Sequence, residues 1–222
     1  MIESRIVDPY VETYIKSLVN ESDGLLNELE LYAEQNHVPI VQSEIAQFLR
    51  VFIKIHKPKA VLEIGTAIGY SGALIAKAMD EGVIDTIELK EDMYLFAQNT
   101  FNQLSEEVKA VHVNQYLGDA AEVLPTLNRK YDLIFIDASK GHYQAFFDLC
   151  YPLLNPGGVI LSDNVLYKGM IATNHYLVRR KITIVKRMRK YLQFITTHPE
   201  LETTVLPMGD GLAISYKKGG NA

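Results

Sequence analysis

The stretch Val61-Leu-Glu-Ile-Gly-Thr-Ala-Ile-Gly-Tyr-Ser71 decides the fold of this chain of 222 residues. An apolar run over residues 60–64 ends in a turn that contains Gly65 and Gly69, and a helical pattern follows over residues 71–79. With strand, glycine turn and helix in this order, α/β proteins present backbone N–H groups to a nucleotide-like ligand. The glycine spacing is G-x-x-x-G rather than G-x-G-x-x-G, which disfavours an NAD-dependent dehydrogenase.

The composition is that of an ordinary soluble globular protein, with 48% apolar and 22% charged residues. No apolar run approaches the ~18 residues that span a bilayer, and the N-terminal residues do not read as a signal peptide. A single cysteine, Cys150, excludes an internal disulfide framework. We therefore expect a cytoplasmic protein without membrane contact.

Helical periodicity covers residues 8–57, and we expect an N-terminal helical prelude, residues 1–57, packed on a main domain, residues 58–218. From residue 59 the pattern alternates. Strands are expected at 60–64, 83–88, 108–113, 133–137 and 158–162, with helices between them at 71–79, 91–104, 120–127 and 142–153. Strands joined by helices of about ten residues predict right-handed crossovers and a parallel sheet covered on both faces.

The pattern changes after residue 162. A long helix is expected over residues 175–197, and two closely spaced strands follow at 202–206 and 212–216. The connection between them, residues 207–211, is rich in turn residues, so the two strands are predicted to form an antiparallel hairpin at the end of the sheet.

Polar residues at strand ends mark the expected site, because ligands of a doubly wound sheet bind outside the carboxyl ends of its strands. Glu88 ends the second strand, 23 residues after Gly65, where an acid can accept hydrogen bonds from a ribose diol. Together with Glu63 and Ser71 it favours a nucleotide-like cofactor. Asp119 and Ala120 follow the third strand, where an adenine would lie, although Asp119 also fits as the N-cap of the next helix.

A second group of oxygen donors follows the fourth and fifth strands. Asp137 ends the fourth strand, and Asp163 and Asn164 end the fifth. Two carboxylates and an amide oxygen suit Mg²⁺ or Mn²⁺ better than zinc, which favours His and Cys. The alternative is that Asp137 is an acid that contacts the cofactor and that Asp163 and Asn164 form a plain turn.

Two further residues could take part in the chemistry. Lys140 lies three residues beyond Asp137 and could act as a general base, since a nearby dication favours the neutral form of a lysine. Asp210, between the last two strands, could reach the substrate. The plainer alternatives are an exposed lysine in a turn and an aspartate beside a turn glycine.

These motifs together resemble those of the cation-dependent O-methyltransferases, a family that includes catechol and caffeoyl-CoA O-methyltransferases and uses S-adenosylmethionine (SAM). The resemblance covers nearly the whole chain. Its specific pieces are Glu63 to Ser71, Ile136-Asp-Ala-Ser-Lys140, Ser162-Asp-Asn-Val165 and Gly209-Asp-Gly-Leu212. It implies a Rossmann-like SAM methyltransferase fold, an α/β fold with a mostly parallel seven-stranded sheet, an antiparallel C-terminal hairpin and N-terminal helices.

The resemblance also implies the roles of residues. The metal ligands would be Asp137, Asp163 and Asn164, with Mg²⁺ (or Mn²⁺) as the ion, and the catalytic residues Lys140 and Asp137. The residues expected to hold SAM are Val41, Glu63, Gly65, Gly69, Ser71, Glu88, Asp119, Ala120 and Asp137. Relatives of this kind are usually dimers, so a homodimer is expected.

The segment 179–190 holds seven basic residues and no acid, whereas the rest of the chain has 15 basic and 27 acidic residues. At 100° per residue, apolar side chains gather on one side of the predicted helix. A basic ridge gathers on the other, formed by Arg179, Arg180, Lys186, Arg187 and Lys190. A polyanion would use such a ridge and a small catechol would not. The alternative is a solvated helix face.

The surrounding segment resembles bacterial tRNA 5-hydroxyuridine methyltransferases, which produce 5-methoxyuridine at the anticodon wobble base. We therefore expect the tRNA anticodon loop as the acceptor. A small catechol or a CoA-linked phenol is the alternative. A non-catalytic SAM-binding or RNA-binding module is a third hypothesis, which the intact set of Asp137, Lys140, Asp163 and Asn164 disfavours.

Overall fold

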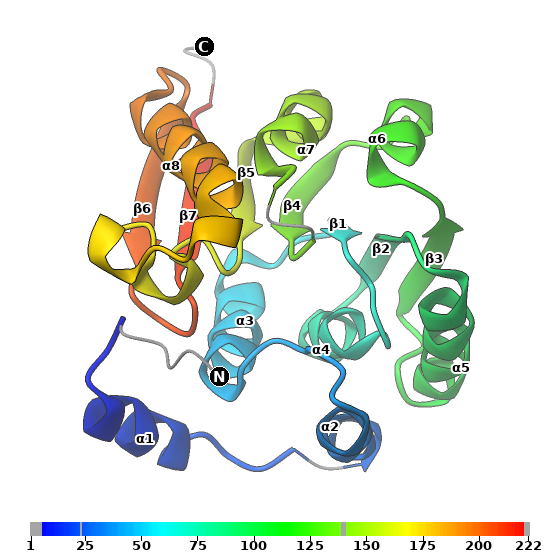
Figure 1. Ribbon diagram of the computed structural model, residues 1–222. Coiled ribbons are helices and arrows are strands. Elements are labelled where there is room, and N and C mark those ends of the chain that lie inside the picture. The colour runs from blue at the N-terminus through cyan, green and yellow to red at the C-terminus, as the bar shows by residue number, and fades with distance from the viewer. Residues whose placement is uncertain (1–5, 23, 139–140, 220–222) are drawn as a thin grey trace. The chain divides into compact units, whose positions relative to one another are not determined.

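The computed structural model describes residues 6–22, 24–138 and 141–219, and its seven strands form one sheet in the order β3-β2-β1-β4-β5-β7-β6 (Figure 1). The strands are β1 (Ala60–Ile64), β2 (Gly82–Glu88), β3 (Val111–Leu117), β4 (Tyr131–Ile136), β5 (Leu154–Ser162), β6 (Leu201–Leu206) and β7 (Leu212–Lys217). β2 is parallel to β1 and β3, β4 is parallel to β5, and β7 is antiparallel to β5 and β6. The predicted fold class and C-terminal hairpin are confirmed.

The α-helices are α1 (Pro9–Ser17), α2 (Gly24–Asn36), α3 (Ser43–His56), α4 (Tyr70–Ala78), α5 (Glu91–Glu107), α6 (Ala120–Val123), α7 (Tyr143–Cys150) and α8 (Ile182–Thr197). The 3₁₀ turns are η1 (Leu124–Thr126), η2 (Tyr151–Leu153), η3 (Tyr167–Gly169), η4 (Asn174–Tyr176) and η5 (Arg179–Lys181). No helix in the described part of the chain is long and apolar enough to cross a membrane.

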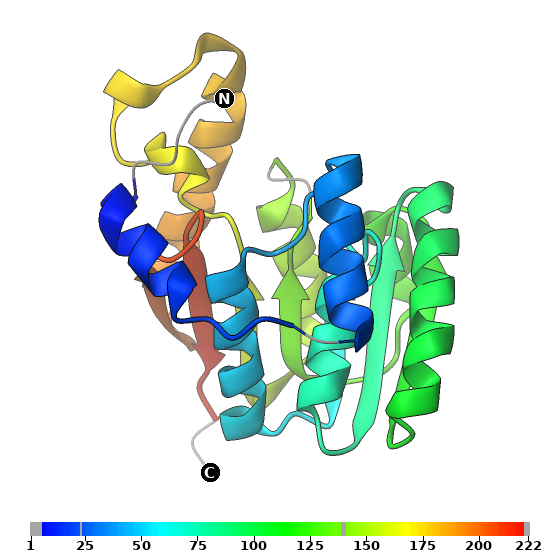
Figure 2. The ribbon, with the colours of Figure 1, turned by 90° about the horizontal axis from the view of Figure 1, so that it is seen from below.

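The chain divides into two compact units, Ile15–Leu127 and Asn128–Ala222 together with Met1–Tyr14. The first, which we call the 15–127 unit, contains β1, β2 and β3. In this unit α3, α4 and α5 lie side by side along one face of the strands (Figures 1 and 2). Its centre is apolar, with Leu49, Leu62 and Leu74 fully buried. The boundary expected at residue 57 stays a prediction.

The second unit, which we call the 128–222 unit, contains β4, β5, β7 and β6. Here α7 and α8 lie next to each other on one face of the strands (Figure 1). Aromatic rings join the two helices. Phe147 meets Phe194 edge-on with centroids 5.3 Å apart, and Tyr143 meets Tyr191 in the same way at 5.6 Å.

Several predicted boundaries differ from the structure: β3 ends at Leu117 rather than at 113, and β5 begins at Leu154 rather than at 158. Two further differences have a clear physical cause. β3 begins at Val111 rather than at 108, because Val108 still donates its N–H to the carbonyl of Leu104 and closes α5. The long helix expected from residue 175 begins only at Ile182. Leu177 and Val178 adopt extended dihedrals there and pack against an apolar cluster that contains Tyr167, so tertiary packing overrides the local helical pattern.

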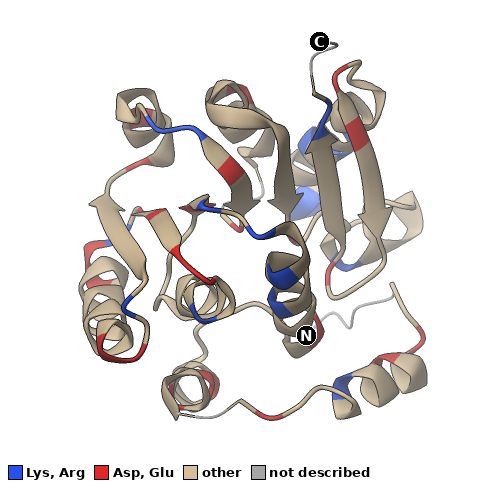
Figure 3. Ribbon diagram, turned by 180° about the vertical axis from the view of Figure 1, so that it is seen from behind, with Lys and Arg blue, Asp and Glu red and all other residues tan. Residues whose placement is uncertain are grey.

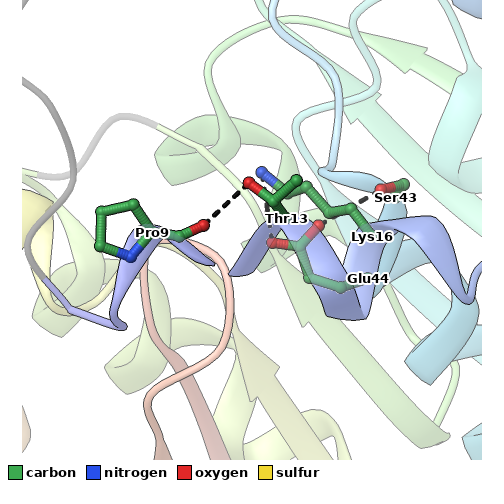
Figure 4. A network of polar contacts seen from close by, with 5 residues as sticks. All are labelled: Pro9, Thr13, Lys16, Ser43 and Glu44. Atoms are coloured by element: carbon green, nitrogen blue, oxygen red, sulfur yellow. Dashed lines mark hydrogen bonds and ion pairs between the residues drawn. The ribbon is translucent and has the colours of Figure 1, made fainter. Parts of the chain in front are cut away.

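Charged residues lie mostly on helices and loops and few lie on strands (Figure 3). One exception to surface placement is Glu44 in the first turn of α3, which is only 5% exposed. Figure 4 shows its contacts with Lys16, whose Nζ lies 3.7 Å from Glu44 Oε1, and with Ser43, whose Oγ donates to Oε2 at 3.3 Å. Within the 15–127 unit this ion pair ties the end of α1 to the start of α3.

Candidate functional site

The turn between β1 and α4 is built on left-handed backbone. Gly65, Ala67 and Gly69 have φ of 105°, 46° and 83°. A side chain at Gly69 would also lie 3.2 Å from the ring of Phe101 in α5, so both the dihedral and the close packing favour glycine there. As in any α-helix, the first-turn N–H groups of α4 have no acceptor within the helix, which suits an anionic ligand group.

Glu63 lies beneath this turn and is fully buried. Its carboxylate accepts the hydroxyl of Ser71 at 2.5 Å and that of Thr86 at 2.6 Å. The hydroxyls of Thr66 and Thr86 are also 2.5 Å apart. Because the proton of Thr86 goes to Glu63, Thr66 must be the donor to Thr86. The hydrogen bonds run from both ends of the turn into one buried carboxylate and fix its shape.

Glu88 is mostly buried and bridges two backbone segments. Oε2 accepts the N–H of Ala67 at 2.8 Å, and Oε1 accepts the N–H of Lys90 at 2.9 Å. The contact with Ala67 holds a non-glycine residue in the left-handed region, which costs about 1–2 kcal/mol. A carboxylate offers about four acceptor positions, so Glu88 retains the capacity to accept hydrogen bonds from a ligand diol.

The remaining predicted cofactor residues of the 15–127 unit lie at its loops. Asp119 is the N-cap of α6, where its carboxylate accepts the N–H of Ala121 at 2.8 Å, and the next residue, Ala120, is buried. Val41 is buried just before α3. Beside it, Gln42 Oε1 is buried, and among the described residues no donor reaches it. An orphaned acceptor of this kind fits a ligand N–H group.

In the 128–222 unit, the ends of the neighbouring strands β4 and β5 bring together the predicted metal ligands. The amide nitrogen of Asn164 donates to Asp137 Oδ1 at 3.1 Å. Asp163 N–H donates to the carbonyl of Ile136 at 3.0 Å, which extends the β4–β5 pairing to the base of this group. Asn164 has φ of 60°, a left-handed value that Asn tolerates better than most residues.

Asp163 is only 2% exposed and is held from two sides. Its Oδ1 accepts the N–H of Asn164 at 2.7 Å, and its carbonyl accepts the hydroxyl of Tyr143 at 2.8 Å. Burial, and then the negative charges of Asp137 and Asp163, raise the pKa of Tyr143 well above its usual 10.0.

The loop after Asn164 is clamped to the turn between β6 and β7. The N–H groups of Val165 and Leu166 donate to the carbonyls of Gly211 and Asp210, both at 2.9 Å. Asp210 is 6% exposed, and its carboxylate accepts the N–H of Lys168, which has φ of 56°. Asp210 thus holds the loop that begins at Asn164, a role that differs from the direct contact with substrate considered above.

Lys140, the predicted general base, lies outside the described residues. Within the described ranges no group of three or more His, Cys, Asp or Glu side chains could hold a metal ion. Any ion at the β4–β5 ends would therefore depend on the amide of Asn164 as well as on the two aspartates.

All five residues of the predicted basic ridge are exposed, but only Lys186, Arg187 and Lys190 lie on α8, since Arg179 and Arg180 lie on the preceding turn η5. The buried side of α8 is formed by Val185, Met188, Tyr191 and Ile195. Arg189 differs from the ridge. Its guanidinium donates to the carbonyls of Ile171 at 2.8 Å and Met170 at 3.3 Å, and to Asn174 Oδ1 at 3.1 Å. It anchors the preceding loop.

Sequence reasoning missed Thr66, Thr86 and Tyr143. A buried hydroxyl needs a partner, and Thr86 interrupts an apolar strand. The sequence does not show that this partner is Glu63 or that Thr66 donates to Thr86. Tyr143 carries no such signal, since an aromatic residue at the start of a helix is indistinguishable from ordinary core.

Residues 16–218 match the model of a family described as O-methyltransferase. The chain is 28% identical over 222 residues to a catechol O-methyltransferase from Niastella koreensis, covering 94% of this chain and 96% of that protein. A crystal structure of a candidate caffeoyl-CoA O-methyltransferase from Staphylococcus aureus has a TM-score of 0.83 and 33% identity, covering 94% of this chain and 99% of the other. A Bacillus cereus O-methyltransferase in complex with S-adenosylhomocysteine (SAH) has a TM-score of 0.79 and 25% identity, with 94% and 97% covered.

Proposed function

The chain belongs to the O-methyltransferase family, and we propose that it transfers a methyl group from SAM to a hydroxyl oxygen with Mg²⁺ or Mn²⁺ as cofactor. The observation that carries the proposal is the hydrogen bond of 3.1 Å between Asn164 and Asp137. It joins side chains from the ends of two neighbouring strands. With Asp163 they offer two carboxylates and an amide, the oxygen donors that suit these cations.

The proposed SAM-binding residues are Val41, Glu63, Gly65, Gly69, Ser71, Glu88, Asp119, Ala120 and Asp137. SAM supplies an electrophilic methyl group on sulfur. Three features support its binding here: the left-handed turn before α4, the remaining acceptor capacity of Glu88, and the orphaned Gln42 Oε1. Glu63 is fully buried, so its part is to hold the turn through Ser71 and Thr86.

The proposed metal ligands are Asp137, Asp163 and Asn164. A divalent cation held by these residues would lower the pKa of an acceptor hydroxyl. Lys140 is the proposed proton acceptor, since a nearby positive charge favours its neutral form. Methyl transfer would form the bond between the acceptor oxygen and the methyl carbon as the carbon–sulfur bond breaks, and Lys140 would take the hydroxyl proton. The chain contributes mainly orientation.

The proposed acceptor is 5-hydroxyuridine at the wobble position of tRNA, which would become 5-methoxyuridine. Its O5 and O4 are adjacent oxygens, as a cation-assisted reaction requires. The exposed basic ridge supports this choice, because each Lys or Arg near a phosphate adds sequence-independent affinity for a polyanion.

The second candidate acceptor is a small catechol or a CoA-linked phenol. It is favoured by the relatives named for catechol and caffeoyl-CoA. These acceptors present the same pair of adjacent oxygens, so the chemistry would be unchanged.

A homodimer is also part of the proposal. α1 has no buried residue and exposes apolar side chains, including Tyr10 and Tyr14, which are 88% and 64% exposed. Light scattering of the purified protein would measure its mass, and a mass near 25.0 kDa would contradict the dimer.

The test is to incubate the protein with SAM and Mg²⁺ and either hypomodified tRNA, 3,4-dihydroxybenzoate or caffeoyl-CoA. Mass spectrometry would identify 5-methoxyuridine or a methylated phenol. Turnover of the phenols without 5-methoxyuridine would select the second candidate. No methyl transfer to any of the three, with or without Mg²⁺, would refute the proposed function.

A further inference from the structure

A groove of about 670 Å³ lies between the start of α7 and the middle of α8, within the 128–222 unit. We call it the α7–α8 groove. Its lining includes Gly141, His142, Gln144, Arg187, Lys190 and Phe194. The volume falls within the range of small-molecule sites. The groove begins at Gly141, four residues after Asp137, so it starts close in sequence to the proposed metal ligands.

The walls of the groove are fixed by packing. Phe194 is held edge-on against Phe147 at 5.3 Å, and Phe147 in turn meets Tyr191 at 6.2 Å. The amide of Gln144 donates to Asp148 at 2.9 Å, which constrains the α7 side. The aromatic wall is therefore in place before a ligand binds, whereas the exposed side chains of His142, Arg187 and Lys190 would be ordered by the ligand.

The charge of the groove favours an anion. Arg187 and Lys190 supply two cations against the one acid in the lining, Asp148, which leaves an excess of one positive charge. One N–H of Arg187 donates to the carbonyl of Gly141 at 3.3 Å, and a guanidinium has five donors. Arg187 is thus aimed at the mouth of the groove and retains donors for a phosphate.

The groove also offers aromatic surface beside these cations. His142 is exposed at the start of α7, and the ring of Phe194 lies on the opposite wall. A nucleobase that stacks on a side-chain ring contributes about 1–3 kcal/mol, whatever the base. An aromatic ring next to two cations suits a nucleotide, because the ring can stack on the flat base and the cations can bind the phosphate.

The length of the basic surface distinguishes RNA from a single nucleotide. Residues 182–190 of α8 cover roughly 12 Å at the helical rise, and the η5 turn that carries Arg179 and Arg180 precedes them. Arg179, Arg180 and Lys186 are exposed outside the groove. We propose that the α7–α8 groove binds one nucleotide of an RNA acceptor. In the RNA strand this nucleotide is next to the one that is methylated. Its phosphate lies on Arg187 and Lys190, and its base lies between His142 and Phe194. This rests on the proposed function, because it requires an RNA acceptor.

The experiment measures binding of a fluorescent anticodon stem-loop RNA with 5-hydroxyuridine at the wobble position, in the presence of SAH and Mg²⁺. Lys190→Gln should raise the dissociation constant about tenfold, as expected for loss of a charged hydrogen bond. It should also lower the slope of log affinity against log salt by about 0.7. The matched control is Lys54→Gln, which removes the same charge from an exposed site on α3 and should change neither.

The base is tested by His142→Ala. This substitution should weaken binding of the intact RNA. Two further RNAs each carry one abasic nucleotide, either 5′ or 3′ of the modified base. For the RNA whose missing base is the one that the groove binds, His142→Ala should not weaken binding further. Affinities of both variants equal to that of Lys54→Gln would overturn the inference. A raised KM for caffeoyl-CoA with unchanged RNA binding would assign the groove to the CoA nucleotide instead and overturn it as well.

Turnover of 3,4-dihydroxybenzoate by the wild-type protein distinguishes failure of the groove to bind RNA from absence of methyltransferase activity. If the wild-type protein methylates this phenol and the variants bind RNA as the wild type does, RNA binding by the groove is refuted and the methyltransferase activity is kept. Absence of methyl transfer to every acceptor would remove the proposed function, whatever the groove binds.

Discussion

The carboxylate of Asp210 accepts a hydrogen bond from the backbone N–H of Lys168, a residue with φ of 56°. Tyr167 and Gly169, on either side, are also left-handed, with φ of 46° and 76°. Consecutive residues in this region are unfavourable, and they persist only where surrounding contacts hold them. Asp210 supplies such a contact from the β6–β7 turn, and the loop that it holds begins at Asn164.

Asp210→Ala should therefore weaken divalent-cation binding without removing a ligand. We expect the dissociation constant for Mn²⁺, measured by titration calorimetry, to rise about 10–100-fold, as is usual when a group that orients ligands is lost. Asp210→Asn keeps an oxygen acceptor and should recover much of the affinity. Glu202→Gln, an exposed acid on β6, is the control. Equal Mn²⁺ affinity in the alanine variant and the control would contradict this role for Asp210.

Replacing a proposed ligand should have a larger and more selective effect. Asp163→Ala should lower the turnover number by a factor on the order of 10²–10³, since cation assistance is worth several kcal/mol. SAM affinity should stay unchanged, and EDTA should abolish wild-type turnover until Mg²⁺ is restored. Turnover that resists both the substitution and the chelator would remove the cation from the mechanism.

Glu63→Gln should destabilise the 15–127 unit and weaken SAM binding together. The amide has one acceptor oxygen where the carboxylate serves both Ser71 and Thr86, so one hydroxyl must be rearranged in a fully buried site. We expect the free energy of unfolding to fall by about 1–3 kcal/mol, measured by urea denaturation. SAM affinity would be measured by calorimetry.

Glu81→Gln is the matched control, because Glu81 forms an exposed ion pair with Lys59 just before β2. It should change little, since exposed pairs contribute little to stability. If Glu63→Gln behaved like this control, the buried carboxylate would not be holding the glycine turn.

Alkaline pH should destabilise the protein through Tyr191. Burial raises the pKa of this buried hydroxyl above its usual 10.0, and Ser162 Oγ lies 2.7 Å from it. The folded state then keeps the proton that the unfolded state loses. The contribution of Tyr191 to the free energy of unfolding is therefore constant below about pH 10 and falls above it by up to about 1.4 kcal/mol per pH unit.

Tyr191→Phe should remove the contribution of Tyr191 to the decrease in the free energy of unfolding above about pH 10. At neutral pH it should lower the free energy of unfolding by about 1 kcal/mol, because a hydrogen bond is lost. Urea denaturation between pH 8 and 11 would measure both effects. Tyr216→Phe, at a tyrosine 44% exposed on β7, is the comparison. Identical alkaline slopes for the two variants would contradict the assignment.

The glycine turn and the carboxyl ends of β1, β2, β4 and β5 were predictable to within one residue because they depend on local pattern, whereas β3 ends at Leu117 rather than at 113. β1 has the expected bounds, and Asp137, Asp163 and Asn164 gather because parallel neighbours end at one edge. The start of α8 was not predictable, since Leu177 and Val178 follow a helical pattern and yet pack on Tyr167. The roles of Thr86 and Asp210 depend on partners more than 20 residues away, which one sequence does not reveal.

Gly211 shows how a residue can look functional without any chemistry. A Cβ at this position would lie 2.3 Å from Leu166 Cγ and 2.8 Å from Leu166 N, and its φ is 89°. A saturation mutagenesis screen scored by methylation would rank position 211 among the least tolerant in the protein. Substitutions at position 211 would lower methylation through a steric clash that displaces the loop after Asn164. A screen of this kind would therefore assign to the active site a residue that does not take part in the reaction.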